Sequence, residues 1–365
     1  MKRGDPMKLE QLQTPALVAD RAILNANMRA MMAMLEGKTL RLRPHYKSNK
    51  CAAIAHKQME LGAVGITCAK LEEAEDLIDA GVTDVLIANQ VVDPLKIRRL
   101  AELAGMCRLT VCVDDGENAE ALSKAACEAG TTIHVLVEFE IGMERCGVAD
   151  PDLYVALARK VSTLQNLVYD GIQAYAGHVS HMASDEERRS YTDENAARLR
   201  SLIELLKHNG IEVHTLSGGS TGTSRIKAEQ GLYTELQAGS YLFMDSTYRA
   251  LGNLPFRNSL FLLTTVVSKR GALTILDAGV KSLGVDQNEP IFLTMDGEEI
   301  KVDHMAVNEE HCKLFSPDHD LSLGDHVLIV PGHCCSTVNL HDRLYLFENG
   351  EVVDRLAITA RGKSR

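Results

Sequence analysis

The sequence has no excess of basic residues. It contains 39 Lys and Arg against 50 Asp and Glu, for a formal net charge of -11, and its isoelectric point is about 5.6. General binding to nucleic-acid phosphates or to anionic lipid requires clustered Lys and Arg. We therefore expect no nucleic-acid partner and no membrane partner, but a small ligand that carries phosphate or carboxylate and is held at a local site.

Long apolar runs and a disulfide framework are also missing. No apolar stretch near the start is long enough for a secretion signal, and no later segment reaches the length of a membrane-spanning helix. The nine cysteines are odd in number and lie mostly inside apolar runs, which favours reduced thiols in a large intracellular protein. We expect a cytoplasmic protein.

Short apolar or β-branched runs alternate with longer helical patterns from about residue 20 to about residue 245, as is typical of parallel βαβ units. Eight candidate strands lie at residues 39–46, 63–68, 84–89, 109–114, 133–139, 169–175, 212–217 and 235–243. Their number and spacing predict a (β/α)8 TIM barrel of the α/β class. An open doubly wound sheet is the alternative, because periodicity does not show closure. Polar residues just past the strand ends favour the barrel, whose chemistry lies there.

The pattern changes after residue 250. Runs of β-type residues are joined there by Gly, Asp and Asn turns, and Asn349-Gly350 is a strong hairpin signal. We predict two domains, a barrel over residues 20–250 and an all-β domain over residues 251–365 together with residues 1–19. The segment "TPALVAD" is a further predicted strand, which pairs with one of these two domains.

The first candidate for chemistry is Lys47, at the end of a predicted strand in "RPHYKSNK". Its neighbours include Arg43, His45 and Lys50. Nearby positive charge and partial burial both lower the pKa of a lysine, which is what a Schiff-base nucleophile needs. The plainer alternative is a solvated strand end.

The second candidate is the glycine-rich turn "SGGSTGT", residues 217–223, after another predicted strand. Small residues let backbone N–H groups approach an anion, and hydroxyls such as those of Ser220 and Thr221 add donors. The turn matches neither the P-loop nor the dinucleotide fingerprint. Taken alone it is as well explained by a flexible turn, but "AGSY", residues 238–241, follows the next strand. Adjacent late strands of a barrel commonly hold phosphate, so the two turns together favour a phosphate-bearing cofactor.

The third candidate is Arg145, in "VEFEIGMERCG" after a strand that carries Glu138. It is either an ion-paired loop arginine or a cation that orients an oxygen of cofactor or substrate. A lysine suited to an imine, phosphate-binding turns and a barrel together indicate pyridoxal 5'-phosphate.

Motifs along nearly the whole chain resemble those of a known family. They are "TPALVAD", "RPHYKSNK", "VCVDD", "GMERCGV", "GIQAYAGHVSH", "SGGSTGT", "TELQAGSYLFMDSTY", "LDAGVKSLGVD", "NEEHC" and "VPGHCCSTVNLHD". The sequence is similar to the fold-type III pyridoxal-phosphate enzymes related to alanine racemase. Within that group it resembles the D-threonine aldolase and 3-hydroxy-D-aspartate aldolase family, to which D-serine dehydratases are related.

The resemblance implies roles for individual residues. Lys47 is then the Schiff-base lysine, while Arg145 and Tyr175 fix the cofactor ring and its phenolic oxygen. Gln237 stands where alanine racemase has an arginine facing the pyridine nitrogen. Because a neutral amide does not keep that nitrogen protonated, the ring is a weaker electron sink. The residues implied to hold the phosphate are Ser220, Thr221, Gly222, Gly239, Ser240 and Tyr241.

His333 and Cys335 are the candidate metal ligands. One residue separates them, so on an extended segment both side chains point to the same face, whereas Cys334 faces the other way and packs. The plainer alternative is a packed histidine beside cysteines. Two protein ligands leave open positions for substrate on one divalent ion, which is zinc, manganese or magnesium. Thiolate favours zinc, and the resemblance adds that aldolases generally have aspartate at the position of Cys335 whereas related dehydratases have His-x-Cys.

The resulting hypothesis is a metal-assisted, pyridoxal-phosphate-dependent aldolase, which is a lyase. It cleaves a D-3-hydroxy amino acid of the D-threonine or 3-hydroxy-D-aspartate type to glycine and an aldehyde or glyoxylate, with His181 or a metal-bound water as proton acceptor. A D-serine or D-3-hydroxyaspartate dehydratase uses the same residues and is the alternative. An alternative of another class is a non-catalytic pyridoxal-phosphate-binding protein. The resemblance also implies a homodimer.

Overall fold

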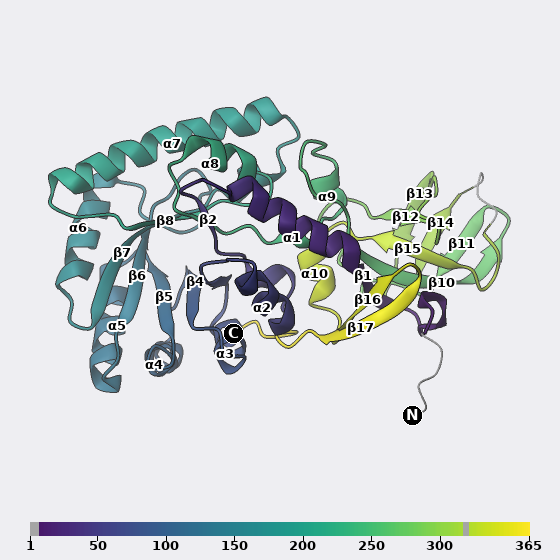
Figure 1. Ribbon diagram of the computed structural model, residues 1–365, viewed down its shortest axis with the longest axis horizontal. Coiled ribbons are helices and arrows are strands. Elements are labelled where there is room, and N and C mark those ends of the chain that lie inside the picture. Colours follow the sequence, from purple (N-terminus) through teal and green to yellow (C-terminus); the bar gives the residue numbers. More distant parts are fainter. Residues whose placement is uncertain (1–6, 317–320) are drawn as a thin grey trace. The chain divides into compact units, whose positions relative to one another are not determined.

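The protein consists of two compact units (Figure 1). The computed structural model describes residues 7–316 and 321–365, so residues 1–6 and 317–320 of the predicted all-β domain lie outside the described residues. One unit, the barrel unit, comprises Met31–Lys47, Ile54–Gly239 and Lys363–Arg365. The other, the β-unit, comprises the chain up to Ala30, Ser48–Ala53 and Ser240–Gly362.

The barrel unit contains an eight-stranded parallel sheet in the order β2-β9-β8-β7-β6-β5-β4-β3. The strands are β2 (Arg41–Leu42), β3 (Ile66–Cys68), β4 (Asp84–Gln90), β5 (Arg108–Val113), β6 (Ile133–Glu138), β7 (Leu167–Ala174), β8 (Thr215–Gly218) and β9 (Glu235–Leu236). A parallel bridge between His45 and Thr67 joins the two ends of this order. The predicted TIM-type barrel of the α/β class is therefore confirmed, and an open sheet is excluded.

Helices alternate with these strands. They are α2 (Ala52–Glu60), α3 (Leu71–Asp79), α4 (Pro94–Leu103), α5 (Gly116–Ala129), α6 (Pro151–Thr163), α7 (Asp185–His208) and α8 (Ser224–Gln230). Figure 1 shows α4, α5 and α6 along the outer side of the strands. The side chains of Asp93, Asp115 and Asp150 accept first-turn N–H groups of α4, α5 and α6, which fixes where these helices begin.

Two predicted strands are shorter than expected at their carboxyl ends. β2 stops before Pro44, which has no N–H for a strand ladder, and the chain continues into the short helix η2 (Tyr46–Ser48). β9 ends at Leu236, and η4 (Ser240–Leu242) follows it. Lys47 and Ser240 therefore lie on short helical turns beyond the strands.

The β-unit is built on a nine-stranded sheet, seven of whose strands have the order β13-β14-β11-β10-β1-β16-β17, while β15 pairs with β10 and β12. Its strands are β1 (Ala16–Asp20), β10 (Leu260–Arg270), β11 (Leu273–Leu276), β12 (Ile291–Leu293), β13 (His304–Val307), β14 (Cys312–Phe315), β15 (His326–Val330), β16 (Arg343–Glu348) and β17 (Glu351–Ala357). β1, from the predicted strand "TPALVAD", pairs with β10 and β16. Asn349 and Gly350 have positive φ in the β16–β17 turn, as the hairpin signal predicts.

The hydrophobic core of the β-unit lies on both faces of β10. Leu262 packs in one cluster of buried residues and Leu263 in another, because successive strand residues face opposite sides of a sheet. The remaining helices are η1 (Leu9–Gln11), α1 (Arg21–Leu35), η3 (Gly177–His181), α9 (Ser246–Arg249) and α10 (Cys334–Val338). Within the described ranges, no helix has both the length and the apolar character that crossing a membrane requires.

Candidate active site

A cavity of about 200 Å³ lies at the carboxyl ends of the barrel strands. Its lining residues come from strand ends or from the segments that follow them. They are His45, Lys47, Ala69, Ala88, Asn89, Arg145, Cys146, Gln173, Tyr175 and Gln237. Four residues that were predicted as site residues from sequence therefore line one cavity, namely Lys47, Arg145, Tyr175 and Gln237.

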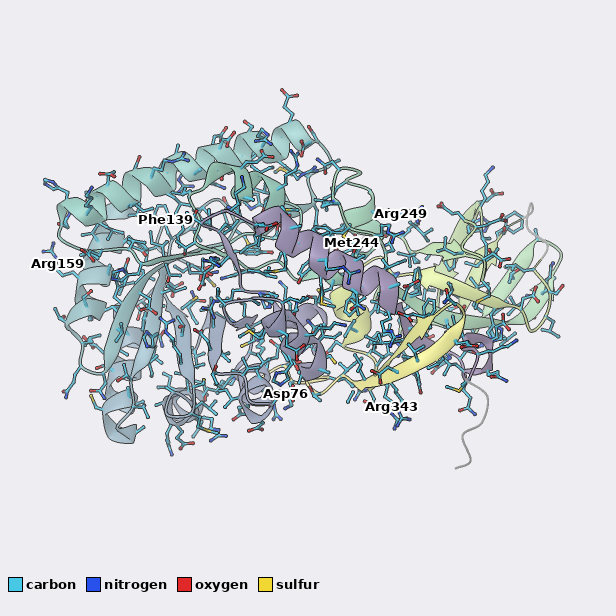
Figure 2. All side chains as sticks on the ribbon, in the orientation of Figure 1. Asp76, Phe139, Arg159, Met244, Arg249 and Arg343 are labelled. Atoms are coloured by element: carbon cyan, nitrogen blue, oxygen red, sulfur yellow. The ribbon has the colours of Figure 1, made fainter. Side chains whose placement is uncertain are left out.

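Lys47 is half-buried on η2, and the turn that carries it is fixed from one side. The hydroxyl of the adjacent Tyr46 donates a hydrogen bond of 2.6 Å to Asp76 of α3, which is labelled in Figure 2, and the Lys363 amine lies 2.9 Å from the same carboxylate. The Lys47 amine lies 5.8 Å from the centre of the Tyr175 ring, and the Arg145 guanidinium lies 5.5 Å from it. Both cations are thus within the range at which an aromatic ring attracts positive charge.

We expected Arg43 to place positive charge near Lys47, but the structure shows its guanidinium paired elsewhere. Its buried guanidinium forms ion pairs of 2.7 Å with Asp84 and with Glu235, the first residues of β4 and β9. The Arg43 charge is therefore neutralised near the amino ends of the strands. Lys50 is also engaged, because its amine donates to the carbonyl of Ala360.

Arg145 lies on an exposed loop that is held by acidic side chains. Gly147 donates its backbone N–H to Asp114 over 2.8 Å, and Glu144 donates its backbone N–H to Glu140 over 2.9 Å. At the end of β6, the buried Glu138 accepts a hydrogen bond of 2.5 Å from Gln90. Burial raises the pKa of Glu138, while the Gln90 hydrogen bond and the Arg145 charge oppose that rise. Arg145 forms no ion pair with any described residue, so its guanidinium is available to a ligand in the cavity.

Gln237 belongs to a buried amide network. Its Nε2 donates to Gln173 Oε1 over 2.7 Å and to Ser217 Oγ over 2.9 Å, while Gln173 Nε2 donates back to Gln237 Oε1 over 3.4 Å. Both N–H groups of Gln237 are therefore used within the protein, which fixes the orientation of its amide. The network is neutral, so it supplies no carboxylate.

The glycine-rich turn after β8 is buried and packs closely against η3. The Ser180 hydroxyl donates to the Ser220 hydroxyl over 2.6 Å. A Cβ atom at Gly222 would lie only 2.0 Å from the Ser180 carbonyl oxygen, so no larger residue fits there. Ser220, Thr221 and Gly222 are thus held as one compact turn. His181, the last residue of η3, is exposed and does not line the cavity.

Gly239, Ser240 and Tyr241 are buried where the chain passes from β9 into η4. The Ser240 carbonyl accepts backbone hydrogen bonds from Phe243 and Met244, which closes η4. The Ser240 hydroxyl lies 4.0 Å from the Cys335 sulfur. One residue predicted to bind phosphate therefore lies next to one predicted metal ligand.

The extended geometry expected for residues 333–335 is wrong. His333 is the N-cap of α10, and Cys335 lies in the first turn of that helix. The two side chains nevertheless form a hydrogen bond with each other. The structure thus brings the predicted metal ligands together, but by a helix start and not by strand alternation.

Asp286 and Asp245 support this turn. Asp286 lies 2.6 Å from His333 Nδ1 and also accepts a hydrogen bond from the Ser336 hydroxyl. Burial would lower the pKa of His333, but its contacts with Cys335 and Asp286 outweigh burial and raise the pKa to about 9. Buried Asp245 accepts the backbone N–H of Cys334 over 3.0 Å.

Cys334 is fully buried, in keeping with a packing role. Its contact with Cys335, together with burial, raises the pKa of its thiol well above the usual value. Across residues 7–316 and 321–365, no cluster of three or more His, Cys, Asp or Glu residues is arranged to hold a metal ion. Any ion held here would therefore have two protein ligands, with its other positions open.

Sequence reasoning missed Gln173 and Asp286. Gln173 could have been predicted from the sequence, because it precedes Tyr175 by two residues and therefore shares its face of the strand end. Asp286 is 47 residues from His333, and no spacing rule connects the two.

A parallel barrel with a lysine at its carboxyl end, followed by a separate β-unit, defines the alanine racemase-like class. In agreement, residues 19–247 match the family described as "Alanine racemase, N-terminal domain", and residues 259–347 match "Putative serine dehydratase domain". The first match includes every strand of the barrel.

Comparison with individual relatives identifies the family to which the chain belongs within this class. The chain is 42% identical to a D-threonine aldolase from Arthrobacter sp., covering 99% of this chain and 96% of that relative. It is 36% identical to a 3-hydroxy-D-aspartate aldolase from Paracoccus denitrificans (strain Pd 1222), with 98% and 94% covered. The crystal structure of a D-threonine aldolase from Filomicrobium marinum matches with a TM-score of 0.94 at 37% identity and 99% coverage of both chains. The chain belongs to the D-threonine aldolase and 3-hydroxy-D-aspartate aldolase family, as its motifs predicted.

Proposed function

We propose that this protein is a pyridoxal-phosphate-dependent, metal-assisted lyase that cleaves D-3-hydroxy amino acids. The reaction yields glycine together with an aldehyde, or with glyoxylate when the substrate is 3-hydroxy-D-aspartate. The observation that carries the proposal is the cavity in which Lys47, Arg145, Tyr175 and Gln237 meet. The identity to curated aldolases over nearly the whole chain supports the reaction type.

The residues present fit the cofactor. The cavity offers an amine at Lys47, an aromatic ring at Tyr175 and a cation at Arg145, and the compact turn at Ser220–Gly222 has the small residues that a phosphate needs. Gly239, Ser240 and Tyr241 are proposed to complete the phosphate site. When bound, pyridoxal phosphate supplies an aldehyde carbon for an amine and a conjugated ring that accepts the electron pair released at Cα.

Lys47 is the residue that would hold the cofactor through its amine, and once released that amine would hold a proton within the cavity. Arg145 and Tyr175 would orient the ring and its phenolic oxygen, since Arg145 lies 5.5 Å from the Tyr175 ring and forms no ion pair with a described residue. The neutral amide of Gln237 is held by Gln173 and Ser217 at the position proposed for the pyridine nitrogen.

His333 and Cys335 fit one divalent metal ion. A bound ion supplies a Lewis acid for the 3-hydroxyl of the substrate. Asp286 holds His333 through Nδ1, which leaves Nε2 to face a metal, as carboxylate–histidine pairs commonly do. Nitrogen and sulfur donors favour zinc over manganese or magnesium. His181 is the proposed acceptor of the hydroxyl proton, with a position on η3 shortly after Tyr175 in the chain.

Cys335 favours a second candidate function. The family resemblance places aspartate at this position in aldolases and cysteine in the related dehydratases, which release hydroxide and produce a keto acid and ammonia. Both reactions require the same lysine, cofactor and metal, so only the products separate them.

The experiment is a product analysis with D-threonine. Purified protein is loaded with pyridoxal phosphate and with zinc, manganese or magnesium in parallel. Acetaldehyde and glycine in equal amounts support the aldolase. 2-Oxobutyrate and ammonia without glycine overturn it in favour of the dehydratase, and cofactor absorbance without any turnover of D-hydroxy amino acids supports a non-catalytic binding protein.

We also propose a homodimer, on the strength of the family resemblance alone. Light scattering coupled to size-exclusion chromatography should give twice the mass of one chain, which is 40.0 kDa. A mass of one chain at micromolar concentration contradicts it.

A further inference from the structure

Lys227, on α8, is a buried lysine that the proposed mechanism does not use. It is 4% exposed, and its amine lies 3.4 Å from the centre of the Tyr233 ring. Among the described residues, the amine makes no ion pair and no hydrogen bond. Lysine is almost never fully buried unless it is paired, so this position needs an explanation.

No protein anion compensates the charge of Lys227. Burial alone lowers the pKa of its amine to about 7, and no charged side chain contributes. The titratable group that faces the amine is Tyr233, whose own pKa is raised by burial and whose hydroxyl donates to the carbonyl of Ala174. A residue with a packing role only would be an aliphatic one here, because burying an unpaired amine is unfavourable.

The Lys227 side chain lies directly against the glycine-rich turn. A Cβ atom at Gly219 would lie 2.7 Å from Lys227 Cδ and 3.1 Å from its Cε, and one at Gly218 would lie 3.0 Å from the Tyr233 ring. Gly219 also has a φ of +80°, which favours glycine. Because these glycines have no Cβ, the aliphatic part of the Lys227 side chain packs directly against the turn, on the side where the Tyr233 ring also lies. We call this side the back of the turn.

The turn itself contains no cationic side chain. Residues 217–223 offer backbone N–H groups and hydroxyls only, and Ser220 and Thr223 already share a hydrogen bond of 3.1 Å. A phosphate monoester carries between one and two negative charges at neutral pH. The glycine-rich turn therefore has the shape for an anion, and Lys227 is a cationic residue whose stem packs against the turn while its amine lies over the Tyr233 ring.

We propose that Lys227 is a phosphate-positioning residue, which supplies the positive charge for the phosphate group of the cofactor from behind the glycine-rich turn. This inference rests on the proposed function and names a residue for the same site. When the phosphate binds, the amine takes up one proton from solvent and becomes an ammonium ion. When the phosphate leaves, the proton returns to solvent.

The first test compares two ligands that differ only in the phosphate. Full-length protein freed of cofactor is titrated at pH 7.5 with pyridoxal phosphate and with pyridoxal, and binding is followed by absorbance. The proteins are the wild type, Lys227→Met and the control Lys207→Met, which removes an exposed lysine of α7.

We expect Lys227→Met to weaken binding of pyridoxal phosphate by about tenfold or more, the scale of one charge interaction inside a protein. Binding of pyridoxal should change by less than about twofold, and the control should behave as wild type for both ligands. An equal loss for both ligands assigns Lys227 to packing and overturns the proposal, as does an unchanged affinity for pyridoxal phosphate.

The second test needs no variant and therefore holds even if Lys227→Met does not fold. Binding of each ligand to the wild type is measured by calorimetry at pH 8 in buffers with different enthalpies of ionisation. Pyridoxal phosphate should take up close to one proton more than pyridoxal, and equal uptake contradicts the proposal. If pyridoxal phosphate gives no imine absorbance with the wild type, the proposed function fails instead, so the two failures are distinguishable.

Discussion

The burial of Lys227 predicts how the free energy of unfolding of the cofactor-free protein depends on pH. Its pKa of about 7 in the folded chain compares with an ordinary value of 10.5, and burial is the cause. A tenfold change in proton affinity corresponds to about 1.4 kcal/mol. Lowering the pKa from 10.5 to about 7 thus reduces the free energy of unfolding by at most about 5 kcal/mol when the amine is charged in both states. This value is an upper bound, because local opening of the structure lets water reach the amine and reduces the cost of burying its charge.

The sign follows from proton binding in the two states. Between about pH 7 and pH 10.5 the unfolded chain binds the proton at Lys227 and the folded chain does not, so the free energy of unfolding rises with pH. Below about pH 7 the amine is charged in both states and the full penalty applies. Above about pH 10.5 it is neutral in both states and the penalty disappears.

Lys227→Met removes this titration. In the absence of cofactor, the substitution should raise the free energy of unfolding by up to about 4 kcal/mol at pH 7 and by about 1 kcal/mol at pH 9.5. The difference between the two pH values cancels any change in packing, which is the same at both. The measurement is urea-induced unfolding followed by circular dichroism at each pH, with Lys207→Met as the control.

A stabilisation that is equal at pH 7 and pH 9.5 refutes the reasoning, because it shows that Lys227 does not titrate in this range. A destabilisation at both values shows that the stem of Lys227 contributes more by packing than its amine costs.

Four further predictions concern the site. Lys47→Ala should abolish the absorbance near the visible edge that pyridoxal phosphate gives with the wild type, with an unchanged far-ultraviolet circular dichroism spectrum; persistence of the band rules out Lys47 as the cofactor lysine. Asp286→Ala should weaken zinc binding by about 10- to 100-fold, because Asp286 orients His333. Competition with a chelator measures the zinc affinity, and the exposed Asp296→Asn serves as the control. Equal zinc affinities of the two variants contradict the role of Asp286. Cys335→Asp should shift the metal that best supports turnover from zinc toward manganese or magnesium, and an unchanged order of metals argues against Cys335 as a ligand. Gly222→Ala should destabilise the barrel unit by roughly 1–3 kcal/mol, because the new Cβ would lie 2.0 Å from the Ser180 oxygen, and an unchanged thermal midpoint speaks against that close contact.

The barrel and its cavity were predictable because their determinants are local. Each strand and helix has its own hydrophobic period, and parallel strands bring their carboxyl ends to one rim. A polar residue just past a strand end, such as Lys47 or Arg145, therefore needs no further information to be placed in the same cavity, whereas Gln237 was assigned by the family resemblance.

Other features depend on contacts between distant residues. The helix that begins after His333 is supported by Asp245, which accepts the N–H of Cys334 from 89 residues away, so spacing alone gave the wrong local geometry. The sequence did not single out Lys227 as a buried or functional residue, because a lysine on a short helix is ordinarily solvated. Its side chain packs against Gly219 and the Tyr233 ring, and the sequence pattern does not encode these contacts.

The place of β1 in the sheet has a consequence for how the chain is made. β1 lies between β10 and β16, and Arg21, just after β1, forms an ion pair with Glu348, 327 residues further on. A ribosome releases β1 early, but neither of its partner strands exists until the barrel sequence has been synthesised. The barrel can fold as it emerges, while β1 waits with both edges unpaired. The slow step in the biogenesis of the protein should therefore be completion of the β-sheet, and chaperones that shield exposed strands should matter most in that interval.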